Sequence, residues 1–415
     1  MTFPGRFHEQ LVADKLDKIA LSFLVDDLEI RRGGTAANVA FGMACLGLRP
    51  LLIGSVGPDF AEYRDWLDRH GVDTGGVRES ERYHTARFVA TTDVAGDQIG
   101  SFYSGAMAED VDIDLAPLVR AHGPFDLVMI GPTSPEAVLS FTAQCRALGI
   151  PFAADPAWQL ARFDGPQVHE LVDGAAYLFT NEYEAALLEQ KTGWTPADVL
   201  ANIEVRVTTL GADGARVERA GSEPIHVPGI ADAAMAEPTG AGDAFRSGFL
   251  AAIAWGLSHE RAGQLGNMLA VHALETVGTQ EYQLKPAAVA DRLAASYGDS
   301  CAAEIGPFLS PLAGAARPPA SPAPRGLSFS VPAGGGVPVA AASASRWRRR
   351  GRPGGAAAGS RWCCAVPVAS SVTLAPAVPP APPPAGTMRR VSALRRPGRR
   401  ARRQILRNAG ILRVI

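Results

Sequence analysis

The sequence has few cysteines and no long apolar run, and both features exclude classes of protein. Its five cysteines form no CxxC pair and no metal-ligand spacing, so we expect neither a disulfide framework nor a zinc site. A membrane-spanning helix needs about 18 or more consecutive apolar residues, and none is present. The opening MTFPGRFHEQLVADKLDKI has no apolar core of the kind found in signal peptides. The sequence therefore predicts a cytoplasmic protein.

Acidic residues are absent after Glu304. All 42 Asp and Glu lie in residues 1–304, which carry a net charge of −20, whereas residues 305–415 contain 18 arginines and no lysine. An acidic body disfavours non-specific binding to nucleic acids. The basic end also holds 17 of the 32 prolines, a composition that cannot bury enough apolar surface to fold. We expect a disordered tail or a shifted reading frame there. A basic arm attracted to RNA or membranes is the weaker alternative.

The first 304 residues show the pattern of an α/β domain. Apolar segments without polar alternation are separated by helical patterns, and they lie at 51–57, 126–132, 150–156, 175–181 and 205–211. Such strands are typical of a parallel sheet that is buried on both faces. The segments 84–92 and 98–105 flank the turn-rich DVAGD and predict a hairpin. We therefore expect a doubly wound, mostly parallel sheet covered by helices on both faces, with a small β-rich appendage.

One motif carries the chemistry of phosphoryl transfer. In PTGAGDAFRSGFLAA, residues 238–252, Gly240, Ala241 and Gly242 open a helix whose first N–H groups can bind an anion. Asp243 follows in the same turn, so a carboxylate base for an acceptor hydroxyl stands beside a phosphate site. A lone GxGD is more often an ordinary helix start. No GxxxxGK[ST] is present, which excludes a P-loop kinase.

Together with other motifs, this segment resembles the ribokinase-like (PfkB) family of carbohydrate and nucleoside kinases over most of residues 1–304. GGTAANVAFGMACLGLRPLLIGSVGPD is similar to the family's first signature. The resemblance implies that Gly33, Gly34 and Asn38 hold the acceptor, and that Asp243 is the general base. It also implies that the β-rich appendage is a lid over the acceptor.

The resemblance extends to the nucleotide and metal sites. NEYE supplies the family's NxxE element, which implies that Asn181 and Glu184 lie near Mg²⁺ and act on it through water. TTLGADGA, residues 208–215, resembles the segment under the nucleotide. The ATP-binding residues implied in this way are Thr209, Gly211, Gly214 and Thr239. The cofactors implied are Mg²⁺ and the co-substrate ATP, with a K⁺ requirement left open.

Stretches such as HTARF, AADP, GAAYLFTNEYE, RVTTLG and GTQEY resemble bacterial adenosine kinases within the family. That likeness implies phosphorylation of the 5′-hydroxyl of adenosine, giving AMP and ADP in purine salvage. It implies a lid formed by residues 3–32 and 84–105 that also pairs two subunits. Phe102 of this lid is expected over the adenine, and Gln159 is expected to face the nucleoside.

The sequence departs from the family at its beginning. It starts at the lid-like FPGRF, whereas the family begins with a core strand that carries an Asp ligand of the ribose. Either translation starts upstream of Met1, or the kinase domain of residues 1–304 lacks an interior strand and a main ribose ligand. Two alternatives stay open: a ribokinase- or fructokinase-type sugar kinase, and an inactive homologue with a basic nucleic-acid-binding tail.

Overall fold

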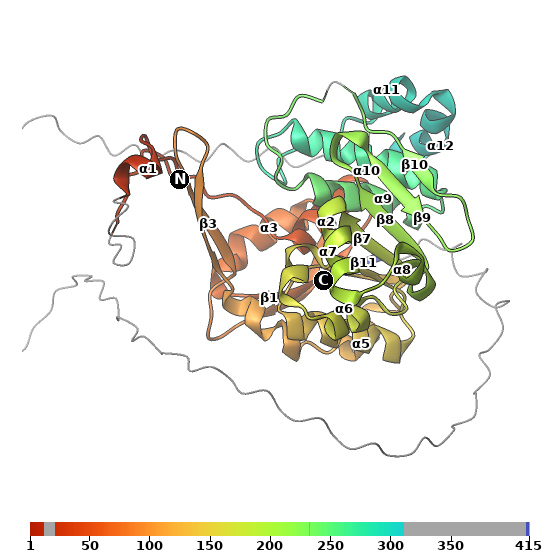
Figure 1. Cartoon of the computed structure of the whole chain (residues 1–415), viewed down its shortest axis with the longest axis horizontal. Helices are drawn as coiled ribbons and strands as arrows, with labels where there is room; N and C mark the ends of the chain where they lie inside the picture. The colour runs from red at the N-terminus through yellow and green to blue at the C-terminus, as the bar shows by residue number, and fades with distance from the viewer. Residues whose placement is uncertain (12–20, 232, 311–411, 415) are drawn as a thin grey trace, which may run out of the picture. The chain divides into compact units, whose positions relative to one another are not determined.

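Nine strands of the described residues pair into one sheet that is flanked by helices (Figure 1). The computed structural model describes residues 1–11, 21–231, 233–310 and 412–414. Across these ranges, the strand order of the sheet is β10-β9-β8-β7-β6-β5-β11-β1-β2. The strands are β1 (Leu51–Val56), β2 (Asp73–Glu79), β5 (Leu127–Ile130), β6 (Phe152–Ala154), β7 (Tyr177–Asn181), β8 (Val205–Thr209), β9 (Ala215–Glu218), β10 (Ile225–Val227) and β11 (Leu412–Val414).

The sheet is parallel from β8 to β2, whereas β9 and β10 run antiparallel to their neighbours. All five apolar segments that were predicted as strands form strands in its parallel part. The helices that precede, separate and follow them are α2 (Thr35–Cys45), α3 (Ala61–Arg69), α4 (Leu115–His122), α5 (Pro135–Leu148), α6 (Gly165–Val172), α7 (Glu182–Thr192), α8 (Pro196–Asn202), α9 (Ala241–Ala254), α10 (His259–Leu274), α11 (Pro286–Tyr297) and α12 (Asp299–Leu309). Short 3₁₀ turns are η2 (Pro58–Phe60), η3 (Gly105–Asp112), η4 (Ala157–Arg162) and η5 (Gly211–Asp213).

Helices cover both faces of the sheet because successive strand residues point to opposite sides. Leu52 and Met129 pack in one apolar cluster with residues of α2, α9 and α10. Their neighbours Leu51 and Val128 pack in a second cluster with residues of α4, α5 and α6. The doubly wound α/β fold predicted from the sequence is thereby confirmed. Among the helices of the described ranges, none has the length and apolar content to cross a bilayer.

The interior position between β1 and β5 is occupied by β11, from the far end of the chain. Arg413 lies opposite Leu51 on one side, Leu412 lies opposite Leu127 on the other, and both pairings are parallel. The expectation of a gap in the sheet is therefore corrected, because these residues pair with the backbone on both sides. The domain boundary also moves, since α12 continues past residue 304 to Leu309. The Pro- and Arg-rich stretch of residues 311–411 lies outside the described residues.

The predicted hairpin is present, and N-terminal residues contact it; the role of these parts as a lid stays a prediction. Its strands β3 (Arg87–Thr92) and β4 (Gln98–Tyr103) pair antiparallel. The backbone N–H of Phe3 donates to the Thr92 carbonyl at 2.8 Å, and the rings of Phe3 and Phe23 lie 4.9 Å apart. In their described part, residues 3–32 form the short helix α1 (Phe7–Gln10), and Asp27 forms an isolated bridge with Thr2. Residues 12–20 lie outside that part.

Candidate active site

The glycine turn before α9 has a backbone that other residues adopt poorly. Gly240 precedes the helix with φ of 82°, in the left-handed region. A Cβ at this position would also lie 2.8 Å from Cγ2 of Thr279. Both observations require glycine at position 240. The second also shows that the start of α9 lies against the loop that follows α10.

The first turn of α9 presents the N–H groups that were predicted to bind an anion. Ala241 donates its N–H to the Pro238 carbonyl at 3.3 Å, so this group is already engaged. Gly242 and Asp243 follow it at the positive end of the helix. Of the three residues predicted for the anion site, Gly240 and Gly242 therefore remain the candidates to donate to a phosphate oxygen.

Asp243 and Asn38 meet across two packed helices. Nδ2 of Asn38, on α2, donates to Oδ2 of Asp243, on α9, at 2.8 Å. Asn38 is 5% exposed. Burial raises the pKa of Asp243 above its ordinary value, while the Arg246 guanidinium and the Asn38 amide act in the opposite direction. A carboxylate whose affinity for protons is raised is suited to accept one from a hydroxyl.

The predicted acceptor turn lies next to Asn38. Gly34 has φ of 101° and caps α2, so the chain turns sharply into the helix. Its carbonyl accepts the N–H of Asn38 at 2.8 Å, and the carbonyl of Gly33 accepts the Tyr63 hydroxyl at 2.9 Å. Gly33 and Gly34 are both exposed, which leaves their backbone open to a ligand.

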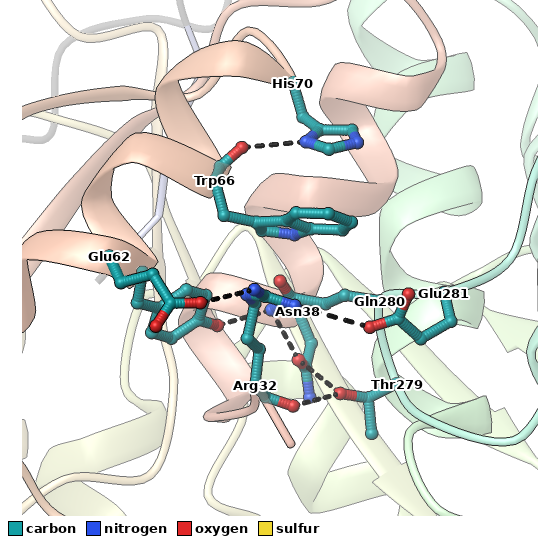
Figure 2. A network of polar contacts seen from close by, with 9 residues as sticks. Arg32, Asn38, Glu62, Trp66, His70, Thr279, Gln280 and Glu281 are labelled. Carbon is teal, nitrogen blue, oxygen red and sulfur yellow. Dashed lines mark hydrogen bonds and ion pairs between the residues drawn. The ribbon is translucent and has the colours of Figure 1, made fainter. Parts of the chain in front are cut away.

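A polar network joins this turn to the loop that follows α10 (Figure 2). Oδ1 of Asn38 accepts the Thr279 hydroxyl and Nε2 of Gln280, each at 2.9 Å. The Thr279 hydroxyl also lies 3.1 Å from the carbonyl of Arg32. Figure 2 shows the Arg32 side chain passing below the Trp66 ring, with the guanidinium carbon 4.2 Å from the ring centroid.

A buried ion pair lies one turn along α9 from Asp243. Nη2 of Arg246 donates to Oδ1 of Asp155, just after β6, at 2.6 Å. Burial raises the pKa of Asp155 to about 7, although the neighbouring guanidinium favours the charged form. A Cβ at Gly242 would meet Nη1 of Arg246 at 2.8 Å. Gly242 thus leaves room for this arginine beneath the helix start.

Asn181 and Glu184 form a reciprocal cap at the start of α7. Oδ1 of Asn181 accepts the N–H of Glu184, and Oε2 of Glu184 accepts the N–H of Asn181, both at 2.8 Å. Within the described ranges no group of three acidic, His or Cys side chains could enclose a metal ion. One oriented carboxylate nevertheless fits Mg²⁺, which keeps most of its waters and takes few protein ligands.

The predicted ATP-binding residues lie on two segments. Thr209 ends β8 and Gly211 and Gly214 belong to the turn into β9, whereas Thr239 is exposed just before Gly240. A Cβ at Gly214 would lie 2.1 Å from the Val227 carbonyl. The glycine at 214 is therefore needed for packing within the sheet. Contact of these residues with a nucleotide stays a prediction.

Phe102 on β4 and Trp158 in η4 form an aromatic pair between the β3–β4 hairpin and the core. Their ring centroids are 5.7 Å apart with the planes at 62°, and they are 50% and 49% exposed. Gln159, the next residue, is fully buried, and its Nε2 donates to the Thr133 carbonyl. The side chain expected to face the nucleoside is thus enclosed, whereas its neighbour Trp158 is accessible.

The sequence pattern of the pfkB family carbohydrate kinases matches residues 10–286. The chain belongs to this family. Membership makes it an ATP-dependent kinase that acts on a sugar or nucleoside hydroxyl. The signatures around Asn38 and Asp243 are the segments that the structure brings together.

Relatives within the pfkB family include nucleoside and sugar kinases. A nucleoside kinase of Methanocaldococcus jannaschii is 28% identical over 253 residues, 60% of this chain and 80% of that protein. A ribokinase of Bacillus subtilis is 28% identical over 274 residues, 65% of this chain and 90% of that protein. The structure of a Burkholderia thailandensis nucleoside kinase with inosine is 30% identical, with a TM-score of 0.63, over 72% of this chain and 94% of that one.

Sequence reasoning missed three polar residues of this pfkB site. Arg246 lies three positions after Asp243 on the same helix, a spacing that places the two side chains on one face and could have drawn attention to it. Thr279 and Gln280 are more than 240 positions from Asn38 along the chain. Both belong to the family-like stretch GTQEY, but no local pattern marks their contact with Asn38.

Proposed function

We propose that this chain is a nucleoside kinase that phosphorylates the 5′-hydroxyl of adenosine with ATP, giving AMP and ADP in purine salvage. The aromatic pair of Phe102 and Trp158 carries the choice of a nucleoside over a free sugar. Both rings are half-exposed and belong to the lid and the core, and flat apolar faces bind a purine better than a polyol. The likeness to a nucleoside kinase bound to inosine supports the same choice.

The chemistry assigned to the chain follows from Asp243 and the start of α9. As the acceptor oxygen forms its bond to the γ-phosphorus, Asp243 takes the hydroxyl proton. The bond from that phosphorus to the β–γ bridging oxygen breaks, and ADP leaves with the electron pair. The first-turn N–H groups at Gly242 and Asp243 stabilise the charge on the transferred group. Asn38, Gly33 and Gly34 hold the ribose.

Glu184 is the residue that we assign to Mg²⁺, through water. Its carboxylate is fixed by the Asn181 N–H, and its charge is felt by the Asp155–Arg246 pair. The ion supplies neutralisation of the β- and γ-phosphate charges when it is bound with ATP. The exposed lid residues Phe88 and Val89 offer a surface on which two copies could pair, as proposed for the lid.

A substrate panel tests this function. The purified chain is incubated with ATP, Mg²⁺ and, separately, adenosine, inosine, ribose or fructose, and the product is identified by mass spectrometry. We expect AMP from adenosine with the highest kcat/KM. Phe102→Ala should lower kcat/KM for adenosine roughly tenfold or more by loss of stacking, while Val94→Ala on the same hairpin should not. Phosphorylation of ribose in preference to adenosine would overturn the proposal.

A further inference from the structure

The direction of each hydrogen bond around Asn38 is set by its neighbours. The Tyr63 hydroxyl donates to the Gly33 carbonyl, so it can only accept from Nε2 of Gln280. The other hydrogen on that nitrogen points to Oδ1 of Asn38. Nδ2 of Asn38 is then left to face Asp243. Nε2 of Gln280 therefore donates in both directions, to Tyr63 beside the Gly33–Gly34 turn and to Asn38 beside the Asp243 carboxylate.

We propose that Thr279 and Gln280 are positioning residues that orient the amide of Asn38 and, through it, the carboxylate of Asp243. The inference rests on the proposed role of Asp243 as general base. With two donors on its oxygen, the Asn38 amide has one favourable orientation. The reversed amide would set Oδ1 against the Asp243 carboxylate, two acceptors face to face. Neither Thr279 nor Gln280 touches Asp243 in the network, so they act on it only through Asn38.

The same loop is tied to the acceptor turn. The Thr279 hydroxyl carries one proton, which it shares between Oδ1 of Asn38 at 2.9 Å and the Arg32 carbonyl at 3.1 Å. Arg32 in turn pairs with Glu62 at 3.1 Å and with Glu281 at 3.6 Å. Figure 2 shows these contacts converging from three separate segments of the chain. The loop that contains Thr279 and Gln280 thus fixes the position of Asp243, through Asn38, relative to the turn that precedes α2.

Thr279 has a second contact that an experiment must separate from its hydroxyl bond. The Cβ of any residue replacing Gly240 would lie 2.8 Å from Cγ2 of Thr279, which places this methyl group over the glycine. Valine at 279 keeps a methyl there and removes the hydroxyl. Serine keeps the hydroxyl and removes the methyl. The two variants therefore divide hydrogen bonding from packing.

The test compares steady-state kinetics of Thr279→Val, Thr279→Ser and Gln280→Met, with adenosine and ATP as substrates. We expect Thr279→Val and Gln280→Met to lower kcat roughly tenfold, the fold-change that corresponds to one lost hydrogen bond, with an unchanged KM for ATP. Thr279→Ser should stay within about twofold of the parent chain. Thr276→Val is the matched control, because among the described residues the Thr276 hydroxyl bonds only the His272 carbonyl of α10; its kcat should not change.

A double-mutant cycle shows whether the effect passes through Asn38. In the background Asn38→Ala, adding Thr279→Val should lower kcat no further, because the amide that it orients is gone. Full additivity of the two substitutions would overturn the inference, as would an equal loss in Thr279→Ser and Thr279→Val. Asp243→Asn separates this failure from that of the proposed function. If that variant stays active, the role of Asp243 is wrong; if it is inactive while Thr279→Val is normal, only the positioning role is wrong.

Discussion

Arg246 and Asp155 form an ion pair that is almost sealed from water. Nη2 and Oδ1 are 2.6 Å apart, and the two side chains are 9% and 0% exposed. Arg246 also acts on Asp243, because it lies on the same helix and its guanidinium opposes the burial that raises the pKa of that carboxyl. The pair connects the end of β6 to α9, and hence the sheet to the proposed base.

Breaking this pair should cost far more stability than breaking one at the surface. Arg246→Met leaves Asp155 buried without its partner, and we expect the free energy of unfolding to fall by about 3–5 kcal/mol. Arg292→Met is the control, because Arg292 and Glu275 are each 28% exposed; its loss should be about 1 kcal/mol or less. Urea titrations measure both. Equal losses would show that water reaches the Asp155 pair.

Asp243→Asn should remove most turnover and leave ATP binding nearly intact. The amide keeps the shape of the side chain but cannot take a proton, and general-base assistance is typically worth ~10² to 10⁴ in rate. Single-turnover assays give the rate and calorimetry gives the ATP affinity. Asp291→Asn, on the exposed side of α11, is the control. Turnover near that of the parent chain would contradict the assignment of Asp243.

Glu184→Gln should raise the Mg²⁺ concentration needed for half-maximal rate. Glutamine keeps an oxygen for the Asn181 N–H but loses the charge that attracts a hydrated ion. Glu182→Gln removes an exposed charge from the same first turn of α7 and serves as the control. Mg²⁺ titrations of kcat at saturating ATP compare the two. If both curves match the parent chain, Glu184 is only a helix cap.

The stability of the chain should depend on pH through Asp110. Its carboxylate accepts the Ser55 N–H at 2.7 Å, and burial raises its pKa from 3.8 to about 6 against the effect of hydrogen bonds from Thr133 and Ser55. Because the folded pKa is the higher one, this group's stabilising contribution is complete below about pH 4 and lost as the pH rises through about 6.

Asp110→Asn isolates this contribution, since the amide does not titrate. We expect the free energy of unfolding of the parent chain, relative to the variant, to fall between about pH 4 and pH 7. Urea titrations at intervals across this window measure the difference. Asp112→Asn, at an exposed position nearby, should give a difference that is flat with pH. A flat difference for Asp110→Asn as well would mean that its carboxyl titrates alike in the folded and unfolded chain.

Local patterns revealed the parts of the site that local physics determines. Gly240 and Gly242 before an apolar helix mark an anion-binding start, and Asp243 stands in that same turn, so sequence alone placed the candidate base. The role of Asn38 was predicted from the family resemblance. Its partners Thr279 and Gln280 meet it only because α2 packs on α9 and α10 follows α9, a tertiary relationship that no helix or strand period encodes.

Strand β11, in contrast, was not predicted from the sequence. Periodicity identified the longer parallel strands, which are apolar on both faces. Leu412–Val414 is three residues long and follows a stretch rich in Pro and Arg, so its composition suggested no packed core. The position of β11 in the sheet is explained by the facing edges of β1 and β5, which are open without it. Such edges require backbone partners whatever the side chains are.

This pairing leads to a prediction about the end of the chain. Arg413 lies opposite both Leu51 and Val128, so its backbone sits between two parallel neighbours. Arg413→Pro removes the N–H and places a ring where the ladder continues. Each buried group left unpaired costs on the order of 1–3 kcal/mol, against a total stability of about 5–15 kcal/mol. We expect a large fall in melting temperature and, with it, in the yield of active kinase.

Arg413→Ala is the matched control, because it removes the side chain and keeps the backbone N–H. If β11 stabilises the sheet through its backbone, the alanine variant should melt near the parent chain and the proline variant well below it. Ending the chain after residue 411 should resemble the proline variant, and a peptide with the sequence of residues 405–415 should then restore part of the lost stability, since the vacated position accepts a parallel strand. Equal melting temperatures for Arg413→Pro and Arg413→Ala would show that the β1 and β5 edges do not depend on this strand.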